Sequence, residues 1–491
     1  MFETAELGRS VGREEYESEV RTLRLQLLEA QRDLQLAGVP VIVLLGGADG
    51  AGKGETVSRV LEWLDTRGLD VHAFGPPTDE ERERPRWWRY WMRLPPRGRI
   101  GIFFGSWYSE PLVERAFSRL SRARYDRMLS EIAFFEQMLA EDGTLFVKLW
   151  IHLSKKGQRR RLRRLEADPA TRWKVTKADW KRFRKYDRFI EASEHAIRRT
   201  DTSLAPWVLV EATDERYRDL MAGRTLLERF QARLAAAPAG SPAPPPAMSR
   251  EASLTILDRV DLERTLPLPA YERRLARGQG RLGRLVRAAF EEKRSTVVVF
   301  EGWDASGKGG NIRRITAAID PRNYRVISVA VPTDEEKARH YLWRFWRHVP
   351  RAGYVTVYDR SWYGRVLVER VEGFARPEEW SRSYLEINDF EQQLVSHGVV
   401  LAKFWLHIDG TEQLRRFQER ETVAWKRHKI GPEDWRNREK WDRYEEAVSD
   451  MIARTSTAQA PWTLVAANDK KWARVRVVES LCARLERALG G

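Results

Sequence analysis

The stretch "TVVVFEGWDASGKGGNIRRITAAI", residues 296–319, joins a β-branched run to a helical pattern through a glycine-rich turn. The run predicts a buried strand. Glycines between a strand and a helix let backbone N–H groups wrap a phosphate at the positive end of the helix dipole. A plain turn without a ligand is the alternative, but the spacing Gly-x4-Gly-Lys favours a phosphate loop. We therefore expect the phosphate-binding residues to be Gly302, Ser306, Gly307, Lys308 and Gly309.

The residue after the loop lysine is Gly309, where such loops usually carry a Ser or Thr that ligates magnesium. Another hard oxygen donor must then replace that hydroxyl. Asp304 lies inside the loop, and Asp359 follows the apolar run "YVTVY" (354–358), where an acidic residue of a neighbouring strand is usual. We expect these two aspartates to hold Mg²⁺, with a capping or turn role as the alternative for each.

Strand-like runs alternate with helical patterns through the rest of this region. The helical patterns are "GKGGNIRRITAAI", "EKARHYLWRFWRHV" (336–349), "WSRSYLEINDFEQQLVSH" and "GTEQLRRFQERE". This alternation predicts an α/β fold with a parallel, doubly wound sheet that binds ligands at the carboxyl ends of its strands. The predicted strands are 296–300, 325–331, 354–358, 400–408 and 462–467.

The whole arrangement occurs twice in the chain. Lys53 in "GGADGAGKGE" and Lys308 are 255 residues apart, and the same offset relates Trp107 to Trp362 and Trp207 to Trp462. Between the copies lies "AAAPAGSPAPPPAM", whose composition is typical of an extended linker. We predict one domain over residues 1–234, a Pro/Ala-rich linker over 235–250, and a second domain over 251–491.

Composition limits the class of protein. The 491 residues carry a formal net charge of +16, which favours polyanionic partners such as nucleic acid, an anionic membrane or condensed phosphate without choosing among them. A solvated Arg-rich surface is the alternative. A single cysteine, Cys482, excludes an intramolecular disulfide, and the N-terminus lacks a secretory pattern. No apolar run reaches the length of a membrane span. We expect a soluble, cytoplasmic protein.

Arginines cluster after the strands. Arg360 and Arg365, in "DRSWYGR", follow a predicted strand, and their planar donors suit phosphate oxygens. Arg416 and Arg420 are four residues apart and so share one face of a helix, placed where a lid would follow the fourth strand. A solvated basic face is the alternative for that pair. We predict that these arginines neutralise phosphate charge.

These residues together resemble the polyphosphate kinase 2 family, and specifically its fused two-domain members that act as polyphosphate:AMP phosphotransferases. The resemblance rests on "GWDASGKGG", "DRSWYGRVLVERVEGF", "AKFWLHI", "VAWKRHKIGPEDW" and the C-terminal "APWTLVAAND" region, with a departure at Asn311. It implies tandem P-loop kinase-like (thymidylate-kinase-like) domains, a helical lid, Mg²⁺, and polyphosphate as phosphoryl donor. The catalytic residues that it implies are Asp304, Lys308, Asp359, Arg360, Arg416 and Arg420.

The first half departs from this pattern. Phe104 and Gly105 stand where Asp359 and Arg360 stand, Glu110 replaces Arg365, and Leu165 replaces Arg420. Because phosphoryl transfer depends on positioning and charge neutralisation, these losses should remove most catalysis. We predict that the second half is active and that the first half completes a pseudo-dimer; further homo-oligomerisation and ligand binding by residues 1–234 stay open.

The expected reaction is transfer of the terminal phosphoryl group of inorganic polyphosphate to AMP, giving ADP, without nucleic acid or membrane as partner. Three alternatives remain: a nucleoside monophosphate kinase that uses ATP, a polyphosphate-dependent ADP or GDP kinase, and a polyanion-binding protein without catalysis. For the nucleotide, Asp334 in "VPTDEE" is the candidate contact, with a turn aspartate as the alternative.

Overall fold

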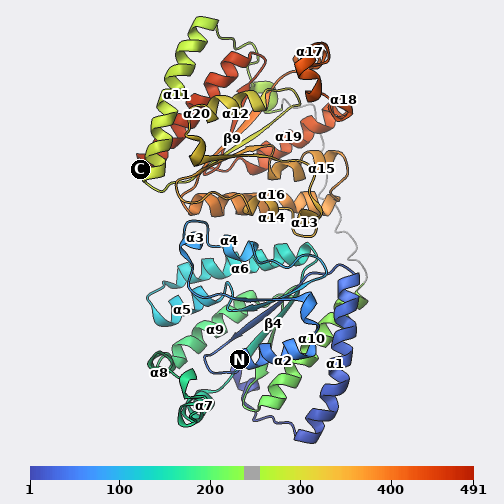
Figure 1. Ribbon diagram of the computed structural model, residues 1–491, viewed down its shortest axis with the longest axis vertical. Helices are drawn as coiled ribbons and strands as arrows, with labels where there is room; N and C mark the ends of the chain where they lie inside the picture. The colour runs from blue at the N-terminus through green and yellow to red at the C-terminus, as the bar shows by residue number, and fades with distance from the viewer. Residues whose placement is uncertain (237–254, 491) are drawn as a thin grey trace. The chain divides into compact units, whose positions relative to one another are not determined.

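The computed structural model describes residues 1–236 and 255–490, and within them two five-stranded sheets (Figure 1). All the strand pairs are parallel, in the orders β2-β3-β1-β4-β5 and β7-β8-β6-β9-β10. The repeat in the sequence is therefore a repeat of topology. The strands are β1 Val41–Gly47, β2 Leu69–Ala73, β3 Ile100–Phe104, β4 Leu145–His152, β5 Trp207–Glu211, β6 Thr296–Gly302, β7 Tyr324–Ser328, β8 Val355–Asp359, β9 Val400–His407 and β10 Trp462–Ala466.

Helices cover both faces of each sheet, as Figure 1 shows, which confirms the predicted doubly wound α/β class. In the first half they are α1 Arg13–Leu36, α2 Lys53–Trp63, α3 Asp79–Arg82, α4 Trp88–Trp91, α5 Ser109–Phe117, α6 Arg122–Glu141, α7 Lys155–Ala167, α8 Lys177–Phe183, α9 Tyr186–Thr200 and α10 Glu215–Ala235. In the second half they are α11 Leu268–Glu291, α12 Lys308–Thr316, α13 Asp334–Lys337, α14 Trp343–Trp346, α15 Val368–Val371, α16 Pro377–Ser396, α17 Gly410–Thr422, α18 Pro432–Glu439, α19 Trp441–Thr455 and α20 Lys470–Leu489.

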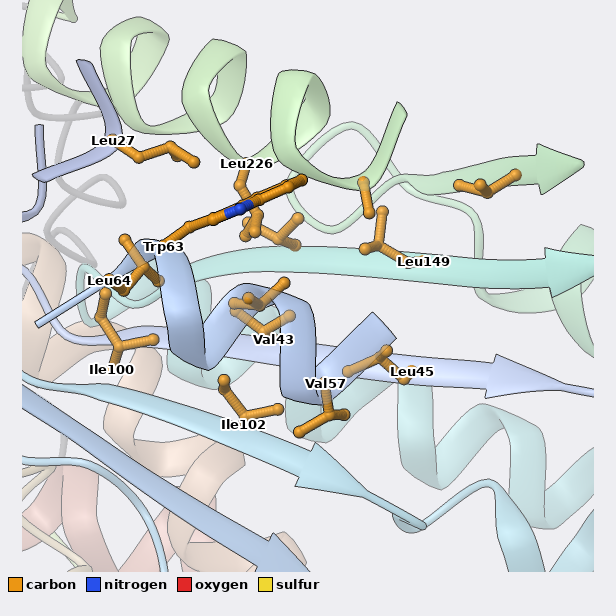
Figure 2. Packing of buried hydrophobic residues seen from close by; sticks show 14 of the residues in the cluster. Leu27, Val43, Leu45, Val57, Trp63, Leu64, Ile100, Ile102, Leu149 and Leu226 are labelled. Atoms are coloured by element: carbon orange, nitrogen blue, oxygen red, sulfur yellow. The ribbon is translucent and has the colours of Figure 1, made fainter. Parts of the chain in front are cut away.

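One face of the first sheet packs against α1, α2 and α10. Alternate residues of the central strand, including Val43, point to this face because side chains alternate along a strand. They meet Leu27 of α1, Trp63 of α2 and Leu226 of α10, each at most 3% exposed (Figure 2). The nearly complete burial of these side chains stabilises the position of β1, the strand that leads into the glycine-rich loop of the first half.

One predicted helix is wrong. Residues 336–349 form only α13 and α14, separated near His340. Aromatic residues lose side-chain freedom in a helix, so their intrinsic preference for it is weak. Trp343, Phe345 and Trp346 are all at most 5% exposed, so tertiary packing determines this segment. The other three predicted helices are present as α12, α16 and α17.

The described residues divide into two compact units, formed by residues 1–77, 90–236 and 334–340, and by residues 78–89, 255–333 and 341–490. The predicted linker, 235–250, lies outside the described residues except for its first two positions. Within residues 1–236 and 255–490, no helix has both the length and the apolar composition that a membrane span requires.

Candidate active site

The phosphate loop of the second half connects β6 to α12. Its backbone turns through positive φ at Gly302 (152°), Ala305 (63°) and Gly307 (104°), which brings the loop back to the N-terminus of α12. The ammonium of Lys308 donates to the carbonyl oxygens of Gly302 (2.8 Å) and Trp303 (3.1 Å). A cation and the first N–H groups of α12 thus meet at one point, which suits a phosphate group.

A cavity of about 570 Å³ opens over this loop. Seven basic and three acidic side chains line it, so its field favours an anion. The loop, α12, the end of β8, and helices α17 and α20 supply them. The cavity brings together the predicted site residues Asp304, Ser306, Gly307, Lys308, Gly309, Asp359, Arg360, Arg416 and Arg420.

Both carboxylate oxygens of Asp304 accept hydrogen bonds. Arg360 Nη2 donates to Oδ1 at 2.9 Å, and Asn437 Nδ2, from α18, donates to Oδ2 at 2.9 Å. Burial raises the pKa of Asp304, but the charges of Lys308 and Arg360 and these hydrogen bonds outweigh it and lower the pKa overall. The group is therefore an anion at neutral pH. Asn437 is a site residue that sequence reasoning missed.

Arg360 adopts a left-handed backbone conformation, with φ 64°. This conformation costs a side chain about 1–2 kcal/mol relative to glycine. The equivalent residue of the first half is Gly105, with φ 71°. The same turn therefore exists in both halves, and only the second half places a side chain on it despite the strain. Strain of this kind is typical of functional positions.

The two arginines of α17 differ in their surroundings. Arg416 is 2% exposed and donates to the carbonyl oxygens of Ala305 (2.9 Å), Ala467 (2.6 Å) and Asn468 (2.9 Å). These contacts tie α17 to the phosphate loop and to the end of β10. Arg420 lies one turn further along α17 at the cavity wall. Arg416 thus holds the cavity wall together, and Arg420 contributes to the same wall.

Three predicted residues lie outside the cavity lining. Gly302 lies behind the loop, where a Cβ would be 2.6 Å from the Leu406 carbonyl oxygen, so close strand packing explains this glycine. Arg365 pairs with Glu369 at 2.8 Å and packs over the Tyr341 ring at 4.9 Å, so its guanidinium is occupied away from the loop. Asp334 begins α13 with a fully exposed side chain that pairs with Lys337.

The residues present fit a magnesium ion. Asp304 and Asp359 both line the cavity beside Lys308, and the buried hydroxyl of Ser306 has no hydrogen-bond partner among the described residues. No group of three or more His, Cys, Asp or Glu side chains in residues 1–236 or 255–490 could hold a metal without further ligands. Mg²⁺ is usually bound by one or two carboxylates together with water and substrate phosphates.

The phosphate loop of the first half keeps the backbone path of the second. Gly47, Gly50 and Gly52 have φ of 139°, 74° and 100°, at positions equivalent to Gly302, Ala305 and Gly307. Lys53 Nζ donates to the carbonyl oxygens of Gly47 (2.5 Å) and Ala48 (3.1 Å). The loop conformation therefore does not depend on the residues that the first half has lost.

A side chain of the protein covers this first loop. Arg218 of α10 is 1% exposed, and its Nη1 would lie 2.1 Å from a Cβ placed on Gly52. At the equivalent Gly307 the nearest atoms are 3.9 and 4.0 Å away. Ala473, which stands at the position of Arg218, lines the open cavity instead. The guanidinium of Arg218 thus occupies the space over the first loop.

Internal ion pairs neutralise two further cations near the first loop. Arg161, equivalent to Arg416, pairs with Glu55 at 2.8 Å, and Glu55 stands at the position of Gly310. Arg182, equivalent to Asn437, pairs with Asp49 at 2.6 Å. These two guanidinium charges are therefore compensated within the protein.

A family model described as polyphosphate kinase 2 (PPK2) matches residues 10–238 and 266–489, which is both halves of the chain. The chain belongs to the polyphosphate kinase 2 family. Each matched region contains one of the two sheets and its phosphate loop. The match also confirms the resemblance that the motifs of the second half indicated.

Full-length relatives share the duplicated organisation. The chain is 51% identical to a polyphosphate:AMP phosphotransferase of Pseudomonas aeruginosa over 491 residues, which is 99% of both proteins. It is 36% identical to one of Acinetobacter johnsonii, over 94% of this chain and 96% of the relative. A solved structure from Pseudomonas aeruginosa PA01 that carries the family's name matches with a TM-score of 0.90 and 49% identity, over 99% of each chain.

Proposed function

We propose that the chain is a polyphosphate:AMP phosphotransferase, which moves the terminal phosphoryl group of inorganic polyphosphate to AMP and releases ADP. The observation that carries this proposal is the basic cavity over the second phosphate loop, in a chain similar over its full length to proteins of that name. A cavity with seven basic side chains suits two phosphate-bearing substrates at once. A reducing, cytoplasmic location agrees with the single, buried cysteine.

In the proposed reaction a phosphate oxygen of AMP attacks the terminal phosphorus of the chain. The bond to the bridging oxygen breaks, and the shortened polyphosphate leaves with the electron pair. Lys308 and Arg420 neutralise the charge on the phosphoryl oxygens, and Arg360, held by Asp304, lies at the end of β8 where the acceptor approaches. Catalysis of this kind comes from positioning and electrostatic stabilisation, without a covalent enzyme intermediate.

Asp304 and Asp359 are the proposed magnesium ligands. When bound, the ion supplies charge neutralisation between the phosphate groups of donor and acceptor. Asp304 already accepts hydrogen bonds from Arg360 and Asn437, so the protein holds this carboxylate in one orientation. Ser306 also lines the cavity, and its buried hydroxyl has no hydrogen-bond partner among the described residues. Gly309, which leaves open space after the lysine, needs no hydroxyl in this arrangement.

We assign the reaction to the second half alone. The covered loop at Arg218, the internal pairing of Arg161, and the absence of carboxylate and guanidinium at Phe104 and Gly105 support this assignment. The first half would then serve the fold of the whole chain as a pseudo-subunit.

Product analysis tests the proposal directly. Purified protein is incubated with AMP, polyphosphate and magnesium, with ATP as competing donor and with ADP and GDP as competing acceptors. ADP formed from AMP and polyphosphate supports the assignment. Turnover with ATP alone would identify an ordinary nucleotide kinase, and preference for a diphosphate acceptor would identify an ADP or GDP kinase. Salt-sensitive binding without any product would leave a polyanion-binding protein.

A further inference from the structure

Glu301 is a buried carboxylate next to the phosphate loop that the proposed reaction does not use. It is the last residue but one of β6 and is 4% exposed. Burial raises its pKa, against the hydrogen bonds from Ser361 and the positive charges of Lys308 and Arg360. Burying an acid beside a catalytic loop costs stability unless its partners compensate. Its contacts therefore indicate what it does there.

Glu301 holds the turn that follows β8. The hydroxyl of Ser361 donates to Glu301 Oε1 at 2.8 Å and accepts a hydrogen bond from the Tyr363 N–H at 3.3 Å. One residue earlier, the Arg360 N–H donates to the Phe300 carbonyl oxygen at 3.0 Å. The end of β6 thus fixes two consecutive residues of this turn, one by its backbone and one by the side chain of Glu301.

Arg360, which lies between Asp359 and Ser361, is the strained residue of this turn. Arg360 has φ 64°, and its half-exposed side chain is held on the cavity side by Asp304, at 2.9 Å, which leaves its backbone to be fixed by other contacts. The negative charge of Glu301 attracts the guanidinium of Arg360. A residue in a left-handed conformation persists when its surroundings determine it strongly. The hydrogen bond between Glu301 and Ser361 provides that determination from below the cavity.

The first half supplies a comparison within the same chain. There the strained arginine is replaced by Gly105, which adopts φ 71° without cost, and the carboxylate is replaced by Gly46. Ser106 keeps its place and accepts from the Tyr108 N–H at 3.4 Å, as Ser361 does from Tyr363. The carboxylate is therefore present where the turn carries an arginine and absent where it carries a glycine.

We propose that Glu301 is a positioning residue that, through Ser361, holds Arg360 in its strained conformation with its guanidinium over the active-site cavity. This inference rests on the proposed phosphoryl transfer for its effect on rate, but not for its effect on the turn itself. Glu301 does not touch the substrates; it acts through Ser361 and Arg360.

Variants of Glu301 and Ser361 test the proposal by their rates of ADP formation. We expect Glu301→Ala and Ser361→Ala each to lower kcat about tenfold or more, as the loss of a charge-assisted contact at a catalytic turn would do. The double variant should be no slower than the worse single variant, because both remove one interaction. Glu301→Gln keeps an acceptor for Ser361 and should recover most of kcat. The matched control, Ser106→Ala in the first half, should leave kcat unchanged.

Arg360→Gly allows a second double-mutant cycle, which is measured by the unfolding midpoint and does not depend on enzyme activity. Glycine adopts the turn without support, so Glu301→Ala should lower the unfolding midpoint clearly in the native background and less in the Arg360→Gly background. Equal shifts in both backgrounds, or a kcat for Glu301→Ala within twofold of the native value, would overturn the proposal. Lack of ADP formation by the native protein would refute the proposed function, and the unfolding cycle would still decide the role of Glu301. If Glu301→Ala does not fold, Ser361→Ala and Glu301→Gln decide it alone.

Discussion

The two loop lysines offer a matched pair of substitutions. Lys308 and Lys53 each donate to two carbonyl oxygens of their own loop, at 2.8 and 3.1 Å and at 2.5 and 3.1 Å. Burial lowers the pKa of both ammonium groups. Replacement by Met keeps the length of the side chain and removes the same contacts in each half. Each substitution should therefore cost about 1–3 kcal/mol of stability.

Their effects on catalysis should differ. Lys308 lies in the open cavity, and the loss of one preorganised group at the reacting phosphate costs about 2.7–4 kcal/mol of transition-state stabilisation. We expect Lys308→Met to lower kcat about 10²–10³-fold. Lys53 lies in the loop that Arg218 covers, so Lys53→Met should leave kcat unchanged.

The assay is ADP formation from saturating AMP and polyphosphate, with the thermal unfolding midpoint of each variant measured in parallel. Similar midpoints with a kcat ratio of about 10² or more would separate the catalytic from the structural role of the lysine. The reasoning is refuted if the two variants lose activity equally, or if Lys308→Met keeps kcat within threefold of the native enzyme.

Three further outcomes are expected. Asn437→Ala removes a charge-assisted hydrogen bond at 2.9 Å to the proposed metal ligand and should lower kcat/KM about tenfold or more; unchanged kcat/KM at limiting magnesium would contradict this role. Arg365→Ala should lower the unfolding midpoint while the KM for polyphosphate stays within about twofold, because Arg365 packs outside the cavity; a large rise in KM would return it to the phosphate path. Burial lowers the pKa of His407 from 6.5 to about 4, and its neutral Nδ1 accepts from Trp303 at 3.1 Å. The unfolded chain binds this proton first, so stability should fall as pH drops from about 6.5 to 4, and His407→Asn should flatten that part of a denaturation series.

The fold was predictable because the β-branched runs are short, apolar and separated by helical patterns. Where aromatic residues replace that alternation, at 336–349, prediction failed because burial on several sides overrides local preference. Two buried ion pairs also could not be predicted from the sequence. They join Lys403 to Glu391, at 2.7 Å, and Lys148 to Glu136 at the equivalent position. These charges lie on different elements, and no local pattern joins them.

The site residues that could be predicted are those that lie at or just after the carboxyl ends of the strands. Asp304, Lys308 and Asp359 stand where parallel strands finish, and the structure brings them to one cavity. Arg365 shares a motif with Asp359, but the 3₁₀ turn Trp362–Arg365 directs it elsewhere. Asn437 could not be found, because it reaches Asp304 only through the approach of α18 to a loop 133 residues away in the chain.

The loop of the first half keeps the backbone path of the second, although residues proposed for catalysis in the second half are replaced there. Sheet register and glycine conformation preserve Gly47, Gly50 and Gly52 in the geometry of a working loop, although the side chains around them have changed. The two halves therefore differ in the side chains around this loop and not in its backbone frame. A frame of this kind is a starting point for engineering, since a second catalytic centre could be rebuilt there by exchanging side chains, beginning with Arg218 and Glu55, without redesign of the backbone.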